Sequence, residues 1–173
     1  MRKPAGYNEI GTERLLLRTP LETDAAIVKT FGGGEFKNNR HARKWIRGVH
    51  KSIGRKTLFM FYIWLAETGQ HLGRVYIYSK PEIDYEFEVA YGIYEEHRCK
   101  GYATEAARAA IRFAFGQGGR EELCAIVKPE NAASQRVIAK LGFTRCGTRM
   151  VLCDDGENCE LDYFRLYRQN ETQ

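Results

Sequence analysis

The segment with the clearest chemical potential is residues 98–106, which reads RCKGYATEA. It follows a strand-like alternation and opens a helix-like pattern. The first N–H groups of a helix lack intrahelical partners and lie at the positive end of the helix dipole, so they suit a phosphate or pyrophosphate. Gly101 would let the backbone approach such a ligand, and Arg98 and Lys100 add positive charge. An ordinary strand-to-helix turn with two solvated cations is the alternative interpretation.

Two carboxylates precede this segment in the stretch 85–94, where Glu86 and Glu88 share one face of an alternating pattern. A carboxylate that faces a cleft can act as a general base and take a proton from a reacting group. We expect Glu88 to be this base, with Glu86 as its competitor. The alternative without catalysis is that both carboxylates pair with cations of a neighbouring helix.

Hydrophobic patterns predict the elements that would position these residues. Apolar runs and alternation predict strands near 14–18, 57–67, 71–80, 85–94, 123–128, 143–152 and 159–168. Helical spacing predicts helices near 21–31, 35–51, 103–114 and 132–141. Alanines form the apolar stripe of the third helix, which would let it lie close against a sheet. This order predicts an α/β fold of the mixed α+β kind rather than an all-parallel sheet.

Composition sets the broad class. The 173 residues are 43% hydrophobic and 28% charged, which predicts one globular domain spanning residues 1–173 and excludes a disordered chain. No apolar run is long enough for a membrane span, and the N-terminal stretch lacks the apolar core of a secretory signal. Five scattered cysteines predict reduced thiols and a cytoplasmic location. The four histidines have no ligand spacing, so we expect no metal.

Four motifs in register resemble the GNAT superfamily of N-acetyltransferases, and specifically its RimJ/RimL-like branch. They are TERLLLR at 12–18, EVAY at 88–91 leading to RCKGYATEA, NAAS at 131–134, and KLGF at 140–143. The resemblance covers residues 13–168. It implies a central, mostly antiparallel, twisted sheet of about seven strands flanked by about four helices. In that fold a splayed strand pair binds coenzyme A.

The resemblance also implies acetyl-CoA as cosubstrate, without a metal. The loop would grip the pyrophosphate through backbone amides, the end of strand 85–94 would pair with the pantetheine arm, and the start of helix 132–141 would lie near the thioester. The implied coenzyme contacts are Ile93, Tyr94, Arg98, Cys99, Lys100, Gly101, Tyr102, Ala103, Thr104, Asn131 and Ser134. A plain N-cap is the alternative role for Asn131, and a surface hydroxyl is the alternative for Ser134.

This sequence departs from the family pattern at the group that would protonate the leaving thiolate. Ile138 stands where many relatives carry a tyrosine, so Ser134 or water is the expected catalytic substitute. Tyr163 is a candidate acceptor-pocket residue together with Glu86, although an aromatic residue on a final strand is more often core. Cys99 has no histidine or aspartate positioned by sequence to complete a nucleophilic set, so we expect direct transfer rather than an acyl-cysteine intermediate.

The resemblance implies an enzyme that moves acetyl from acetyl-CoA to a primary amine. Its RimJ/RimL-like branch favours a protein or peptide N-terminal amine, with a ribosomal protein as the family precedent. A small-molecule amine acetyltransferase, acting on a polyamine or an antibiotic, is the second possibility. A non-catalytic module that binds coenzyme A or RNA is the third, and it would use the cations of residues 37–47. The chain could act as a monomer or a homodimer.

Overall fold

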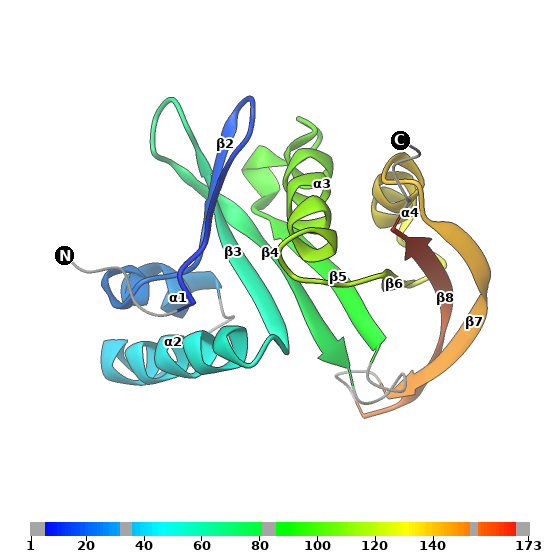
Figure 1. Ribbon diagram of the computed structural model, residues 1–173, viewed down its shortest axis with the longest axis horizontal. Coiled ribbons are helices and arrows are strands. Elements are labelled where there is room, and N and C mark those ends of the chain that lie inside the picture. The colour runs from blue at the N-terminus through cyan, green and yellow to red at the C-terminus, as the bar shows by residue number, and fades with distance from the viewer. Residues whose placement is uncertain (1–5, 32–35, 81–85, 153–155, 169–173) are drawn as a thin grey trace.

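The computed structural model describes residues 6–31, 36–80, 86–152 and 156–168. Within them one eight-stranded sheet runs in the order β1-β2-β3-β4-β5-β6-β8-β7 (Figure 1). The strands are β1 (Glu9–Gly11), β2 (Leu15–Arg18), β3 (Leu58–Leu65), β4 (His71–Lys80), β5 (Glu86–Ile93), β6 (Glu122–Val127), β7 (Thr144–Leu152) and β8 (Asn158–Tyr167). All neighbouring strands are antiparallel except β5 and β6.

The mixed fold and the mostly antiparallel sheet expected from the sequence are confirmed. The expected count of about seven strands is one short, because the three-residue β1 is too short to produce a recognisable alternation. The helices are α1 (Ala25–Phe31), α2 (Asn39–Gly54), α3 (Tyr102–Phe115) and α4 (Ala132–Lys140), with 3₁₀ turns η1 (Glu22–Asp24) and η3 (Glu95–His97). Tyr85, expected to begin the third long strand, lies outside the described residues.

The helices cover opposite faces of the sheet because successive strand residues point to opposite sides. On β3, Phe61 belongs to the core cluster that contains the alanine stripe of α3, whereas Tyr62 packs with α1 and α2. Ala106, Ala107, Ala110 and Ala114 are all fully buried. Since alanine has no side chain beyond Cβ, α3 can lie close to the sheet, and its first turn is thereby fixed beside the end of β5.

Among the strands of the described residues, the only parallel pair is β5 and β6, which meet at one register position, Glu88 opposite Cys124. Beyond that point β5 runs on to Ile93 and β6 to Val127 with no further paired residues. The two strands therefore splay toward the end of β5 that leads into α3. This opening is the feature of the fold that positions the site.

Among the described residues, no helix is both long and apolar enough to cross a bilayer. The thiols of Cys99, Cys124 and Cys146 are free, as the sequence led us to expect. Cys159 is disulfide-bonded, so the expectation of reduced thiols is wrong for this residue. Cys153 lies outside the described residues, and the cytoplasmic location stays a prediction.

Candidate active site

The loop that enters α3 has an unusual backbone. Gly101, the N-cap residue, has φ +82°, and Cys99 has φ +60°. Left-handed backbone of this kind is easy for glycine and strained for cysteine. A glycine N-cap offers no side chain to the first helical N–H groups, and among the described residues none caps them. These N–H groups therefore point outward at the positive end of the helix dipole, ready for an anion.

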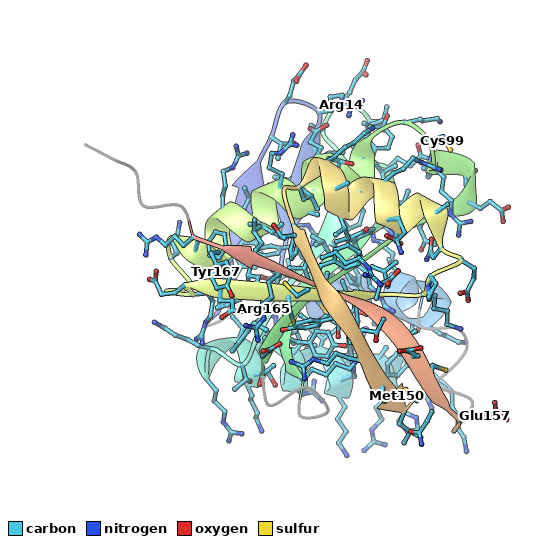
Figure 2. All side chains as sticks on the ribbon, turned by 90° about the vertical axis from the view of Figure 1, so that its right-hand side faces the viewer. Arg14, Cys99, Met150, Glu157, Arg165 and Tyr167 are labelled. Atoms are coloured by element: carbon cyan, nitrogen blue, oxygen red, sulfur yellow. The ribbon has the colours of Figure 1, made fainter. Side chains whose placement is uncertain are left out.

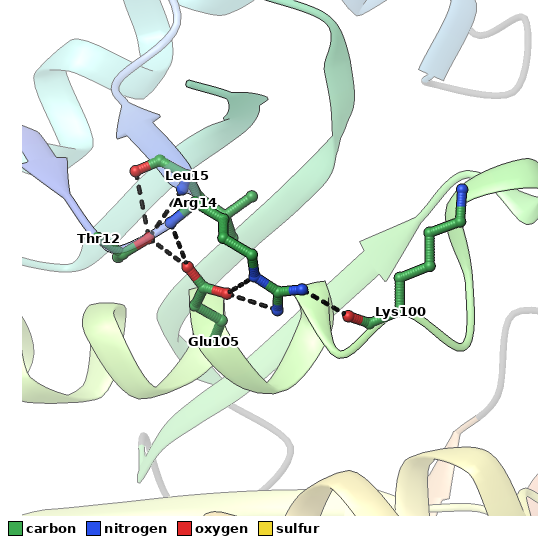
Figure 3. Close-up of polar contacts among 5 residues, drawn as sticks. All are labelled: Thr12, Arg14, Leu15, Lys100 and Glu105. Atoms are coloured by element: carbon green, nitrogen blue, oxygen red, sulfur yellow. Dashed lines mark hydrogen bonds and ion pairs between the residues drawn. The ribbon is translucent and has the colours of Figure 1, made fainter. Parts of the chain in front are cut away.

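Glu105 ties this first turn of α3 to the turn between β1 and β2 (Figure 3). One of its carboxylate oxygens accepts hydrogen bonds from Thr12 Oγ1 at 2.6 Å and from the Arg14 backbone N–H at 2.9 Å. The other accepts from Arg14 Nε at 2.7 Å. Arg14 also donates to the carbonyl of Lys100 at 3.0 Å and lies over the Tyr102 ring. A segment more than ninety residues away in sequence thus holds the loop in place.

The protonation of Glu105 gives a testable consequence. Burial raises the pKa of Glu105, but hydrogen bonds from Thr12 and Arg14 outweigh it and hold the pKa below its ordinary value. A carboxyl with a lowered pKa stabilises the fold above its unfolded pKa, about 4.3, and that stability is lost as pH falls through the folded value. We expect Glu105→Gln to lower the melting temperature at pH 7, and the difference from wild type to shrink as pH falls below about 4.3. A difference that stays constant from pH 7 to pH 3 would contradict this role.

A hollow of about 480 Å³, here called the loop-side pocket, opens between the end of β5 and helices α3 and α4. Most of the residues expected to contact the coenzyme line it: Ile93, Arg98, Cys99, Gly101, Tyr102, Ala103, Thr104, Asn131 and Ser134. Lys100 and Tyr94 do not. The Lys100 ammonium turns back to the Glu96 carbonyl at 3.4 Å, and the Tyr94 ring packs edge-on against His71. Figure 2 shows Arg14 and Cys99 at the same edge of the molecule.

Two cations of this pocket were not expected from the sequence, namely Arg136 and Lys140, which lie one turn apart on α4. They were detectable in principle, because i and i+4 positions share a helix face and α4 begins with the expected Asn131. Lys140 also lines an adjoining hollow of about 590 Å³ on the outer face of α3, together with Arg14, Arg108 and Arg112. The surroundings of the loop are therefore more cationic than its own sequence indicates.

A smaller cavity of about 120 Å³, here called the splay cavity, lies between β5 and β6. Its lining is Glu88, Val89, Ala90, Tyr91, Ala125, Ile126, Val127, Ser134 and Ile138. Tyr91 and Ser134 line both this cavity and the loop-side pocket. Asn131 caps α4 by accepting a hydrogen bond from the Ser134 N–H at 3.0 Å, so its plain capping role is present beside its place in the pocket wall.

Glu88 lies on the opposite side of the sheet from the loop-side pocket. Its neighbour Val89 packs in the cluster with α3, so the Glu88 side chain points toward the α1 and α2 side. Only 7% of Glu88 is exposed, and its Oε2 accepts from Tyr78 at 2.8 Å and pairs with Lys80 at 3.1 Å. No described residue bonds to Oε1. The partners are strand residues, not the cations of a helix.

Glu86 shares that face, because the β4–β5 register continues without a bulge. Both of its oxygens are engaged: Arg165 pairs with one at 2.5 Å, and the Tyr163 hydroxyl donates to the other. Tyr163 is 3% exposed and has Arg149 over its ring. Burial and the hydrogen bond to Glu86 raise the pKa of Tyr163 to about 12. Glu86 does not line the splay cavity, so only Glu88 of the two carboxylates reaches it.

The cations considered for RNA binding lie on or just before α2. Lys37, Arg40, Arg43, Lys44 and Arg47 are exposed, and Arg47 pairs with Glu22 at 2.7 Å. Because α2 packs on the face of the sheet away from α3, this basic surface is separate from the loop-side pocket.

Residues 14–144 match the family model for the acetyltransferase (GNAT) domain. The chain belongs to the GNAT acetyltransferase family. A Bacillus subtilis relative, the uncharacterized N-acetyltransferase YnaD, is 33% identical over 172 residues, covering 94% of this chain and 98% of its own. The B. subtilis protein YkkB is 30% identical over 146 residues, covering 76% and 83%. The protein is therefore an N-acetyltransferase of the GNAT type.

Solved structures share the fold of this GNAT enzyme. A putative ribosomal-protein-serine acetyltransferase from Vibrio cholerae superposes with a TM-score of 0.72 at 22% identity, covering 93% of this chain and 98% of that one. RimL, the ribosomal L7/L12 alpha-N-protein acetyltransferase, in complex with coenzyme A has a TM-score of 0.78 at 15% identity, covering 92% and 98%. These neighbours share the fold expected from the four motifs.

Cys99 of this GNAT enzyme lines the loop-side pocket and is exposed, so its thiol could be mistaken for a nucleophile. No described histidine or carboxylate pairs with it, which leaves it without an activating base. We expect Cys99→Ser to keep most of the wild-type turnover in a coenzyme A release assay. Near-total loss of turnover in a variant with an unchanged melting temperature would overturn this expectation and require a covalent intermediate.

Proposed function

We propose that this N-acetyltransferase moves acetyl from acetyl-CoA to a primary amine by direct attack, and that the amine is the N-terminus of a peptide or protein. The observation that carries the proposal is the splay of β5 from β6. It joins the loop-side pocket, on the α3 side of the sheet, to a cavity reached by Glu88 from the other side. A donor and an acceptor entering from opposite faces would meet in the gap.

The residues present fit a diphosphate-bearing coenzyme. Uncapped N–H groups of α3, the open backbone at Gly101 and the cations Arg98, Arg136 and Lys140 would hold the pyrophosphate. The unpaired edge of β5 beyond Glu88 offers backbone groups to a pantetheine amide. Structural neighbours of the same fold were solved with coenzyme A and with acetyl-CoA, which supports the assignment.

Glu88 is proposed as the base. An ammonium group that enters from the α1 and α2 side would give a proton to Oε1, directly or through one water, and the free amine would attack the thioester carbon. Lys80 and Tyr78 would keep the carboxylate oriented from its other oxygen. Ser134 is proposed to lie beside the thioester, because it lines both cavities. The C–S bond then breaks as the attached nitrogen loses its second proton to water, and coenzyme A departs with its sulfur carrying the electron pair.

A peptide N-terminus suits this site for two reasons. An α-amine has a pKa near 8, so a single carboxylate that is already paired with a lysine suffices to deprotonate it. Structural neighbours are named as acetyltransferases of ribosomal-protein serine, of ribosomal protein S5 alanine and of the L7/L12 α-amine. Among small molecules, a polyamine fits less well because the chain carries a net charge of +5.

The test is coenzyme A release from acetyl-CoA with a panel of acceptors at equal concentration. The panel holds peptides that begin with serine, alanine or methionine, the same peptides with blocked N-termini, spermidine and an aminoglycoside. We expect turnover with the free peptides and none with the blocked ones. Turnover with spermidine or the aminoglycoside alone would replace the peptide acceptor by a small amine. Coenzyme binding without turnover on any amine would overturn the proposed transfer.

A further inference from the structure

Two side chains line both the loop-side pocket and the splay cavity, namely Tyr91 and Ser134. If acetyl passes from one space to the other, the thioester must lie at this junction. The remaining lining of the splay cavity is apolar apart from Glu88, and Ile138 is 1% exposed and has no polar atom in its side chain. Both residues at the junction carry a hydroxyl group, and no other described residue lines both spaces.

Tyr91 approaches the junction from the coenzyme side of the sheet. It belongs with Val89 to the face of β5 that packs in the α3 cluster, opposite to Glu88. Its hydroxyl lies 3.4 Å from the backbone carbonyl of Ser134, in the first turn of α4. Because this hydrogen bond is long, it is weak. The Tyr91 hydroxyl proton can therefore rotate toward a stronger acceptor that enters the junction.

We propose that the Tyr91 hydroxyl donates a hydrogen bond to the thioester sulfur as the C–S bond breaks. The inference rests on the proposed transfer and deepens it. Glu88 takes one proton of the ammonium group, the free amine nitrogen forms the new C–N bond and loses its second proton to water, and the sulfur takes the electron pair of the C–S bond. Tyr91 stabilises that developing negative charge and keeps its own proton, and the thiolate takes its proton from water after release.

The acidity of the two hydroxyl groups favours Tyr91 over Ser134 as this donor. A hydrogen bond to a thiolate strengthens as the pKa of the donor approaches the pKa of a thiol, which is about 8.5 for cysteine. The pKa of a phenol is far nearer to this value than the pKa of an aliphatic hydroxyl. Burial raises the pKa of Tyr91, while its bond to Ser134 acts in the lowering direction. Tyr91 thus remains a protonated donor across the neutral pH range, as an electrostatic stabiliser of a leaving group must.

The first test is Tyr91→Phe, with Tyr62→Phe as the matched control because Tyr62 is a buried strand tyrosine in the cluster with α1 and α2 and lines neither cavity. We expect the first variant to lower kcat by about 10²-fold while the Kd for acetyl-CoA changes less than about threefold. The control should keep wild-type values. A kcat for Tyr91→Phe within threefold of wild type would overturn the proposal, and so would an equal loss in both variants.

A second measurement separates leaving-group stabilisation from a merely structural bond to Ser134. Replacing Tyr91 with 3-fluorotyrosine makes the phenol more acidic with little change in size. We expect kcat to rise at pH 6–7, whereas a structural role would leave it unchanged and contradict the inference.

Coenzyme A release to water, without amine, also breaks the C–S bond. If no amine is acetylated but this hydrolysis depends on Tyr91, the amine transfer fails and the role of Tyr91 stands. If neither reaction occurs, both fail.

Discussion

Replacing Glu88 with glutamine is expected to lower kcat by about 10²- to 10³-fold and to leave the Kd for acetyl-CoA nearly unchanged. Glutamine keeps the size of the side chain and its contact with Tyr78 but cannot take a proton from an ammonium group. The loop-side pocket, where we propose that the coenzyme binds, lies on the other side of the sheet, and Glu88 does not line it. The measurement pairs steady-state kinetics on a peptide acceptor with calorimetric titration of acetyl-CoA.

Lys80→Met is the matched control for that variant. If Glu88 only forms a buried ion pair, removing Lys80 should cost as much turnover as removing the Glu88 charge. A base that loses its cation becomes more basic, so we expect Lys80→Met to keep turnover within a few-fold of wild type. Equal losses in the two variants would show that Glu88 does not act as the base.

The loss of kcat in Glu88→Gln should also become smaller above pH 8, where a peptide α-amine is already neutral.

Gly101→Val is expected to weaken acetyl-CoA binding by about 10²-fold. The residue has φ +82°, which a β-branched side chain adopts only with strain, and a Cβ atom there would lie 3.4 Å from the Arg14 guanidinium. Both effects shift the backbone N–H groups that we propose hold the pyrophosphate. Titration calorimetry gives the change in Kd, and the melting temperature gives the cost to the fold.

Gly119→Val separates these two effects. Gly119 has φ +66°, no atom lies within 4 Å of the Cβ it would gain, and it does not line the loop-side pocket. We therefore expect Gly119→Val to have backbone strain and a drop in melting temperature similar to those of Gly101→Val. Its Kd for acetyl-CoA should be unchanged. Comparable losses of affinity in both variants would show that strain alone weakens binding, and would argue against a diphosphate at Gly101.

Local patterns in the sequence predicted the elements well. The alanine stripe of α3 and the capping residue Asn131 of α4 depend on neighbours within a few positions, so helix spacing and capping preference reveal them. Alternation in β5 placed Glu86 and Glu88 on one face, as the register with β4 confirms. The short β1 gave no such signal, because three residues do not establish a period.

The polar environment of the site was not predictable, because it depends on contacts between distant segments. Residue spacing did not indicate that Glu88 pairs with Lys80 rather than with a helix. The β4–β5 register sets Tyr78 opposite Glu88 and Lys80 opposite Glu86, which brings Lys80 within reach of Glu88. The bonds from Thr12 and Arg14 to Glu105 cross more than ninety positions. The place of Tyr91 in the lining of both cavities depends on the splay of β5 from β6 and on its contact with Ser134 of α4.

We propose that acetyl-CoA binds with its diphosphate at the start of α3 and its acetyl group in the gap between β5 and β6. Calorimetric titration of the wild-type protein with acetyl-CoA measures this binding. We predict saturable heat with one coenzyme bound per chain at a Kd well below millimolar. No heat and no saturation at millimolar acetyl-CoA would contradict the account.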